Sequence, residues 1–323
     1  MSFHPAFDGL RLPVICSPMF IISTPALVIA QCKAGVVGSF PALNAREAKG
    51  EPPLLDIWLR QITEELDAYN QANPDTPAAP FAINQIVHRS NDRIERDVEI
   101  ATKWKVPLWI TSMGAREDVF EAAHSAGALV LHDVTNNHFA HKAIDKGADG
   151  LIAVCAGAGG HAGGLSPFAL IQEIRSWFDG PLALSGSIAT GDSVLAAQAM
   201  GADLAYIGSA FIATQEANAV SDFKQMIVDC GADDVVLTDH FSGVNANYLK
   251  PSIARQGLDP DNLPEQRNRM DLSSADSSPK VWRDIWGSGQ GIGAVDAVVS
   301  TGDLVARLSR EYGAAKQRLS ELP

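Results

Sequence analysis

Basic side chains are scarce in this sequence, and they form no cluster. Its 323 residues include 25 Lys and Arg against 38 Asp and Glu, which gives a formal net charge of −13 at pH 7. Nucleic acids and anionic membrane surfaces are bound largely through concentrated Lys and Arg. We therefore expect neither a nucleic acid nor a membrane as a partner.

Long apolar runs and targeting signals are also lacking. No apolar run approaches the roughly 18 residues of a membrane-spanning helix, and the opening MSFHPAFDGLRLP has no basic segment followed by an apolar one. Hydrophobic residues still make up 46% of the chain and charged residues 20%. This composition supports a large core and excludes wholesale disorder. We expect a soluble, cytoplasmic protein.

The spacings that bind metal ions are absent as well. The four cysteines, at positions 16, 32, 155 and 230, form no CxxC pair, and the eight histidines form no HxH or HExxH motif. Protein zinc sites usually depend on such spacings. The cysteines are typical of buried thiols in a reduced compartment, and we predict no metal site.

What the sequence does contain is a repeated pair of segments. A helix-like stretch ends near glycine, and a short apolar run follows. Eight such runs occur, at residues 12–19, 36–40, 81–87, 105–113, 125–134, 146–156, 180–188 and 200–211. The runs are continuously apolar rather than alternating, which is typical of parallel strands covered on both faces. Eight β–α units in succession most simply close into a (β/α)8 TIM barrel.

The alternative to a barrel is an open, doubly wound sheet. That fold usually has a GxGxxG turn after its first strand and an acidic residue after its second. Here the first strand leads into SPMFIISTP, which offers neither feature. We therefore predict the barrel.

Two stretches exceed what the repeat requires. Residues 54–80, after the second strand, combine an amphipathic helix with a Pro-rich connection, and we interpret them as an insertion. Residues from about 215 to 323 are longer than one closing helix needs. We expect a barrel core over residues 1–225 and a C-terminal cap or lid over residues 226–323. The polar stretch 262–280 within the cap is expected to be mobile.

Small residues end the seventh and eighth predicted strands. The seventh ends in Ser185, Gly186 and Ser187, and the eighth in Gly208 and Ser209. Phosphate sites of such barrels favour the loops after these two strands, where small residues leave backbone amides open. Small residues could instead simply ease packing, but their occurrence at both ends predicts a phosphate-bearing cofactor such as FMN.

Polar groups follow four other predicted strands and would face the same end of the barrel. They are Ser17 in the segment Ser17–Pro18–Met19, Asn84 and Gln85, Thr111 and Ser112 before Met113, and His132 with Asp133. An amide such as that of Asn84 or Gln85 can donate and accept hydrogen bonds along the edge of a pyrimidine-like ring. Each group could equally be a polar strand end with its hydrogen bonds satisfied locally.

A glycine-rich stretch, Gly157–Gly164, carries the single histidine His161 between the sixth strand and a helix. Glycine is needed where the backbone takes a positive φ or closely approaches a ligand. A loose loop with an incidental histidine is the alternative. Because histidine titrates near neutrality and can act as an acid or base, we predict that His161 is a catalytic residue.

Seven segments together resemble those of the nitronate monooxygenase family, formerly called 2-nitropropane dioxygenases. They are PVICSPM, FAINQ, CAGAGGHAGG, ALSGSIATG, YIGSAFIAT, TDHFSGVNANYL and DIWGSGQGIG. The family is related to flavin-dependent enoyl-acyl-carrier-protein reductases and NADH:quinone reductases. The resemblance covers nearly the whole chain and implies a (β/α)8 barrel with non-covalent FMN.

The resemblance also assigns roles to residues. It implies FMN phosphate on Gly186, Ser187, Gly208 and Ser209, next to Ser185. The flavin ring would lie near Pro18, Met19, Asn84 and Gly160, Gly159 and the loop at Gln290 would also bind the cofactor, and His161 would be catalytic. One position departs from the pattern, because relatives often carry lysine where this chain has Asp133.

Three functions remain open at this point. The first is oxidation of alkyl nitronates, and of nitroalkanes, with O2 to a carbonyl compound and nitrite. The second is NAD(P)H-dependent flavin reduction acting on a quinone or an enoyl thioester. The third is FMN binding without turnover, which the complete His161 loop disfavours. We expect a small-molecule substrate and a monomer or homodimer.

Overall fold

Eight parallel strands close into a barrel. The computed structural model describes residues 4–48, 50–263 and 283–321. Its barrel strands are β1 Val14–Cys16, β2 Gly38–Pro41, β3 Phe81–Ile86, β4 Leu108–Ser112, β5 Leu129–Val134, β6 Gly150–Val154, β8 Leu182–Ser185 and β9 Leu204–Ile207. They pair in the order β1-β9-β8-β6-β5-β4-β3-β2, and a parallel bridge between Ile15 and Val37 joins the two ends. The predicted (β/α)8 barrel is confirmed.

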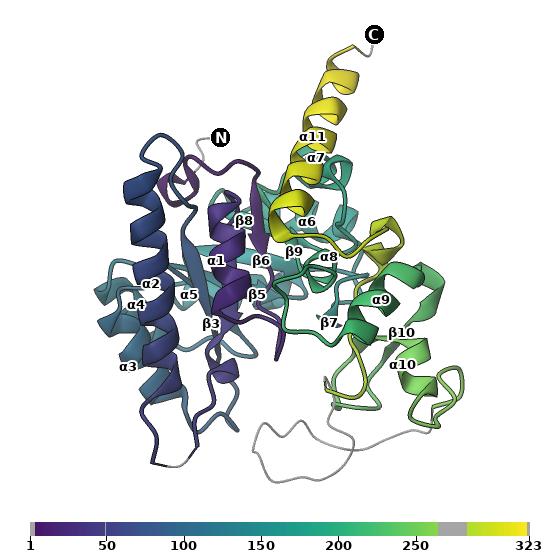
Figure 1. The fold of residues 1–323 in the computed structure, drawn as a ribbon, viewed down its shortest axis with the longest axis horizontal. Coiled ribbons are helices and arrows are strands. Elements are labelled where there is room, and N and C mark those ends of the chain that lie inside the picture. Colours follow the sequence, from purple (N-terminus) through teal and green to yellow (C-terminus); the bar gives the residue numbers. More distant parts are fainter. Residues whose placement is uncertain (1–3, 49, 264–282, 322–323) are drawn as a thin grey trace.

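Helices follow the strands and surround the barrel (Figure 1). They are α1 Pro25–Lys33, α2 Leu54–Ala72, α3 Ile94–Lys103, α4 Glu117–Ser125, α5 Asn137–Asp145, α6 Pro167–Arg175, α7 Gly191–Ala199 and α8 Ser209–Ile212. Short 3₁₀ helices lie at η1 Pro5–Phe7 and η2 Ala42–Asn44. The segment predicted as an insertion contains α2, which serves as the helix between β2 and β3 and packs against α1 and α3.

The continuously apolar strands are explained by two buried layers. Alternate residues of each strand point into the barrel or toward the helices. In β4, Leu108 and Ile110 belong to the interior cluster, whereas Trp109 is fully buried between the barrel and the helices. Both faces of a barrel strand therefore select apolar side chains, so no polar alternation appears in the sequence.

The C-terminal part of the chain adds a small antiparallel sheet next to the barrel. β10 Val235–Thr238 pairs with β11 Ala246–Leu249, and β11 pairs with β7 Gly160–His161. The remaining elements are α9 Ser221–Asp229, η3 Ala232–Asp234, α10 Lys250–Ala254, η4 Gln290–Ala294 and α11 Thr301–Ser320. The division into residues 1–225 and 226–323 stays a prediction. The stretch predicted to be mobile lies outside the described residues, apart from positions 262 and 263.

The last helix, α11, packs along α7 and also contacts α1. Figure 1 shows its C-terminal turns extending beyond the barrel. The contact is tight at Gly191, where an added Cβ would lie 2.1 Å from the Tyr312 backbone nitrogen and 2.3 Å from the Leu308 oxygen. Within the described residues, no helix is both long enough and apolar enough to cross a membrane.

Candidate active site

A cavity of about 680 Å³ opens at the carboxyl ends of the barrel strands. Active sites of (β/α)8 barrels lie at this end, where the loops after the strands meet. Residues at or just after the carboxyl ends of β1, β2, β3, β4, β5, β6, β8 and β9 contribute to the wall, together with Val244, Gly287, Gly289 and Gly291 of the C-terminal part. Segments far apart in the sequence therefore share one cavity.

Almost all of the site residues predicted from the sequence line this cavity. They are Pro18, Met19, Asn84, Gly159, Gly160, His161, Ser185, Gly186, Ser187, Gly208 and Ser209. Gln290 is different, because the wall is formed by its neighbours Gly289 and Gly291. The Gln290 backbone N–H donates to the Gly157 oxygen at 2.9 Å, which places this residue behind the glycine loop. Gln85 does not line the cavity either, and its buried amide has no hydrogen-bond partner among the described residues.

Three loops approach one another so closely that only glycine fits between them. A Cβ on Gly157, whose φ is +83°, would lie 2.1 Å from Ser187 Oγ. A Cβ on Gly159 would lie 2.9 Å from the Gly289 nitrogen, and one on Gly291 would lie 2.8 Å from the Ser187 carbonyl carbon. We call these loops, residues 157–160, 186–187 and 289–291, the glycine cradle.

Hydroxyl and amide groups complete the cradle. Ser209 Oγ accepts the Gly289 N–H at 2.8 Å, which ties the end of β9 to the C-terminal part. Ser187 has a φ of +54°, a strained value for a residue other than glycine. Such strain often occurs at binding sites. Small residues and backbone amides are the groups that accommodate a phosphate, so the cradle suits the phosphate end of a flavin nucleotide.

His161 is half-buried on the cavity wall, and its ring lies within hydrogen-bonding distance of Ser242. Its Nε2 lies 3.3 Å from Ser242 Oγ, and Ser242 donates its own hydrogen to the Val244 oxygen at 3.0 Å. This contact helps to hold the imidazole in place on the wall. Burial lowers the His161 pKa to about 4, whereas the sequence suggested titration near neutrality. The imidazole is neutral at pH 7, which is the form of a base.

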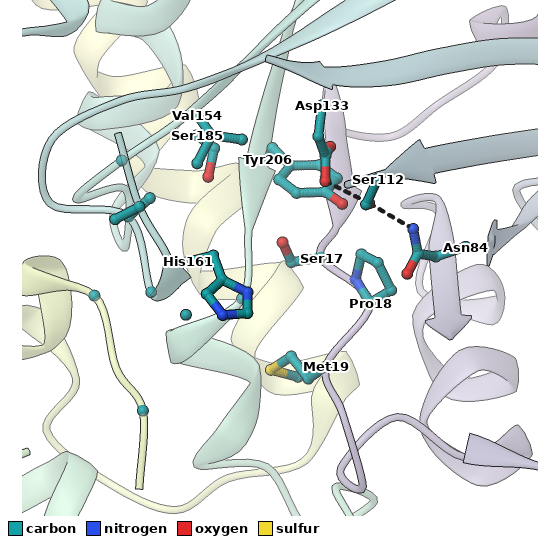
Figure 2. Close-up of a pocket in the computed structure, with 18 of the residues that line it drawn as sticks. Ser17, Pro18, Met19, Asn84, Ser112, Asp133, Val154, His161, Ser185 and Tyr206 are labelled. Carbon is teal, nitrogen blue, oxygen red and sulfur yellow. Dashed lines mark hydrogen bonds between the residues drawn. The ribbon is translucent and has the colours of Figure 1, made fainter. Parts of the chain in front are cut away.

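Three polar side chains from neighbouring strands form a hydrogen-bonded series on the wall. Asn84 Nδ2 donates to Ser112 Oγ at 2.8 Å, and Ser112 Oγ donates to Asp133 Oδ2 at 2.7 Å (Figure 2). Burial raises the Asp133 pKa to about 7, and the Ser112 hydrogen bond partly opposes this rise. Next to this series, Thr111 Oγ1 lies 2.7 Å from His132 Nδ1, and burial lowers the His132 pKa to about 4.

Sequence reasoning missed three residues that support the site. Tyr206 is buried on the cavity wall, Asn247 donates to the Ala158 oxygen at 2.7 Å, and Ser242 orients His161. Two of them lie in the segment TDHFSGVNANYL, which resembles the family. Their roles depend on the pairing of β11 with β7. Among the described residues, no group of three or more His, Cys, Asp or Glu could hold a metal ion.

Comparisons with solved structures support the fold. FabK from Thermotoga maritima superposes with a TM-score of 0.76 at 20% identity, covering 97% of this chain and 96% of that one. Nitroalkane oxidase from Streptomyces ansochromogenes superposes with a TM-score of 0.75 at 22% identity, covering 97% and 99%. At these identities the likeness concerns the fold alone.

Comparisons of sequence identify the family. Nitronate monooxygenase from Neurospora crassa is 26% identical, covering 98% of this chain and 92% of that protein. Nitronate monooxygenase from Paraburkholderia phytofirmans is 25% identical, covering 78% and 77%. The profile of the nitronate monooxygenase family matches residues 2–311. With this match over nearly the whole chain, the barrel and its cavity belong to an enzyme of the nitronate monooxygenase family, a family of flavin-dependent oxidoreductases.

Proposed function

We propose that this protein binds FMN and oxidises alkyl nitronates, and nitroalkanes after deprotonation, with O2 to a carbonyl compound and nitrite. The observation that carries the proposal is that a neutral imidazole, His161, shares one cavity with the glycine cradle. The cradle suits a phosphate, and the imidazole suits proton removal from a weak carbon acid. The family supplies the reaction class.

Most of these cavity residues would bind the cofactor, and His161 would transfer a proton. Gly186, Ser187, Gly208 and Ser209 would hold the phosphate. Pro18, Met19, Asn84 and Gly160 would border the ring, Gly159 and Ser185 would also contact the cofactor, and Gln290 would support the loop at Gly157. The flavin, when bound, supplies the redox chemistry. A single cradle favours the monophosphate FMN.

His161 would remove a proton from the nitroalkane before the substrate is oxidised. The lone pair of its neutral imidazole would accept the proton from the carbon next to the nitro group, and Ser242 would hold the ring in place. An already ionised nitronate needs no such step and would only be oriented. The cavity wall also includes the apolar side chains of Met19 and Ile22. These side chains limit the access of water to the reacting carbon.

One observation favours the second candidate function, reduction of a quinone or an enoyl thioester by NAD(P)H. The cavity mouth carries large apolar side chains, Phe20 and Phe139, and Phe139 is 47% exposed. A mouth of this kind would accept an acyl chain or a quinone ring as readily as a small nitroalkane. The electron donor therefore distinguishes the two functions.

The test has two steps. The flavin released from purified protein is first identified by chromatography, and we expect FMN. The loaded protein is then mixed without oxygen with propane-2-nitronate, NADH or NADPH, and flavin absorbance is followed. Rapid bleaching by the nitronate supports the proposal. Rapid bleaching only by NADH or NADPH would favour the reductase instead.

A further inference from the structure

The two hydrogen bonds that join Asn84, Ser112 and Asp133 are donated in one direction, from Asn84 toward Asp133. Asn84 Nδ2 donates to the Ile110 backbone oxygen at 3.2 Å as well as to Ser112 Oγ. A backbone oxygen only accepts, so this bond fixes the orientation of the amide. Ser112 therefore receives a hydrogen from Asn84 and has only its own hydrogen to give, which goes to Asp133 Oδ2. Figure 2 shows this series from Asn84 to Asp133.

This direction determines which oxygen of Asp133 can carry a proton. Oδ2 already accepts the Ser112 hydrogen, and the carbonyl-type oxygen is the better acceptor of a neutral carboxyl group. The acid hydrogen of Asp133 therefore belongs on Oδ1. Oδ1 is buried and has no hydrogen-bond partner among the described residues. An ionised Asp133 would leave charge on an oxygen without a donor, which is costly in a buried site.

Among the described residues, no cationic side chain forms an ion pair with Asp133, and only burial and the Ser112 hydrogen bond shift its pKa. Tyr206 of β9 has a raised pKa, first through burial and then through the nearby Asp133 charge. Cys16 of β1 has a thiol pKa raised by burial. The remaining ionisable side chains that share the cavity are His132, His161 and Lys142. Burial keeps both histidines neutral near pH 7, and Lys142 of α5 is exposed to solvent.

We propose that Asp133 is a proton-holding residue of the flavin cavity: Oδ1 takes up one proton from solvent when negative charge enters the cavity and releases it when that charge leaves. Negative charge enters when two electrons reduce the flavin or when a nitronate binds. A permanently charged cation would compensate this negative charge without any proton uptake. An aspartate can compensate it only by accepting a proton and losing its own negative charge. The inference rests on the proposed function, because it requires a flavin in the cavity.

The sign of the pH dependence follows from the position of the carboxyl group. The pKa of about 7 applies to the cavity without added negative charge. Charge on a reduced flavin raises that pKa further. Below about pH 7, Asp133 is neutral in both redox states and takes up nothing. Above about pH 7, it is ionised beside oxidised flavin and protonated beside reduced flavin, so reduction consumes one extra proton.

The test is the midpoint potential of the bound flavin as a function of pH, measured between pH 5.5 and 9 on protein as purified. For a two-electron couple, one extra proton steepens the slope by about 30 mV per pH unit. We expect this steeper slope above about pH 7 in the wild type and its absence in Asp133→Asn. The asparagine keeps an oxygen that accepts from Ser112 but cannot ionise. Asp145→Asn, an exposed residue at the end of α5, is the matched control and should behave as wild type.

A second variant separates proton holding from a merely structural role. Ser112→Ala removes the hydrogen bond that lowers the Asp133 pKa, so the change of slope should move to higher pH. A change of slope that persists in Asp133→Asn, or that Ser112→Ala moves to lower pH, would overturn the proposal. Either result would leave the proposed function intact, since the measurement involves no nitronate turnover. A protein that binds no flavin would overturn both proposals.

Discussion

His161 and Asp133 line the same cavity, and burial moves their pKa values in opposite directions. The His161 pKa falls to about 4 and the Asp133 pKa rises to about 7, because burial penalises the charged form of each. At neutral pH the cavity therefore contains a neutral base and a carboxyl group near its midpoint. An aspartate at this position can gain or lose a proton near neutral pH, which a permanently charged side chain cannot do.

The base role of His161 predicts a loss that depends on the ionisation of the substrate. His161→Asn should reduce the rate on neutral nitroalkanes by about 10²–10⁴-fold, the usual contribution of a general base. The same variant should lose much less on ionised nitronates, because no proton remains to be removed. Steady-state kinetics on both forms of 2-nitropropane measures the difference.

The control for this prediction is His138→Asn, an exposed histidine of α5 that does not line the cavity. It should leave both rates unchanged. The His161 variant should retain FMN, since the predicted phosphate contacts come from other loops. Equal losses on both substrate forms would show that the imidazole anchors the substrate and does not remove its proton.

At the scale of elements, the barrel strands were predictable and β7 was not. A run such as LWITS at residues 108–112 is largely apolar, so the local sequence alone predicts a strand. β7 has only two residues, Gly160 and His161, and forms through pairing with Asn247 and Ala246. Such pairing is non-local and has no period in the sequence. The orientation of His161 toward Ser242 therefore could not be predicted.

The glycine cradle predicts a sharp difference between two Gly→Ala substitutions. Gly157 and Gly127 have φ values of +83° and +77°, but only Gly157 faces a contact, Ser187 Oγ at 2.1 Å, whereas Gly127 has open space. Gly127→Ala should cost only the backbone strain, about 1–3 kcal/mol. Gly157→Ala should in addition displace Ser187 and weaken FMN binding. Denaturation curves and fluorescence titration with FMN measure the two effects.

Unchanged FMN affinity in Gly157→Ala would show that Ser187 takes no part in holding the cofactor. If Gly127→Ala also released FMN, the effect would come from strain in the barrel and not from the cradle.

At the scale of the whole molecule, the packing of α11 on the barrel predicts opposite effects for two other glycines. Gly191→Ala would place a Cβ against the backbone of Tyr312 and Leu308 and should destabilise the fold by about 1–3 kcal/mol, the usual cost of overpacking. Gly313→Ala in α11 meets nothing within 4 Å and should stabilise by about 0.5–1 kcal/mol through helix propensity. Urea denaturation measures both. Equal effects would mean that α11 does not pack on α7 in solution.

Some features of the fold and the site could be predicted from the sequence, and others depend on contacts that the sequence does not reveal. Barrel topology and the small residues after β8 and β9 follow from local patterns, so they could be predicted. Asn84, Ser112 and Asp133 were each singled out, yet their connection depends on strand register and side-chain torsions. The same holds for Gln290, whose loop reaches the cavity while its side chain lies behind Gly157. Residues brought together by closure of the barrel carry no joint signal along the chain.

Product analysis in air tests the central claim most directly. Purified protein is incubated with propane-2-nitronate without NADH or NADPH, and nitrite, acetone and dissolved O2 are measured over time. We expect nitrite and acetone to appear in equal amounts while O2 is consumed, at a rate that metal chelators do not change. Absence of nitrite, together with rapid NADH or NADPH oxidation by the same preparation, would contradict nitronate oxidation and assign the cavity to a reductase.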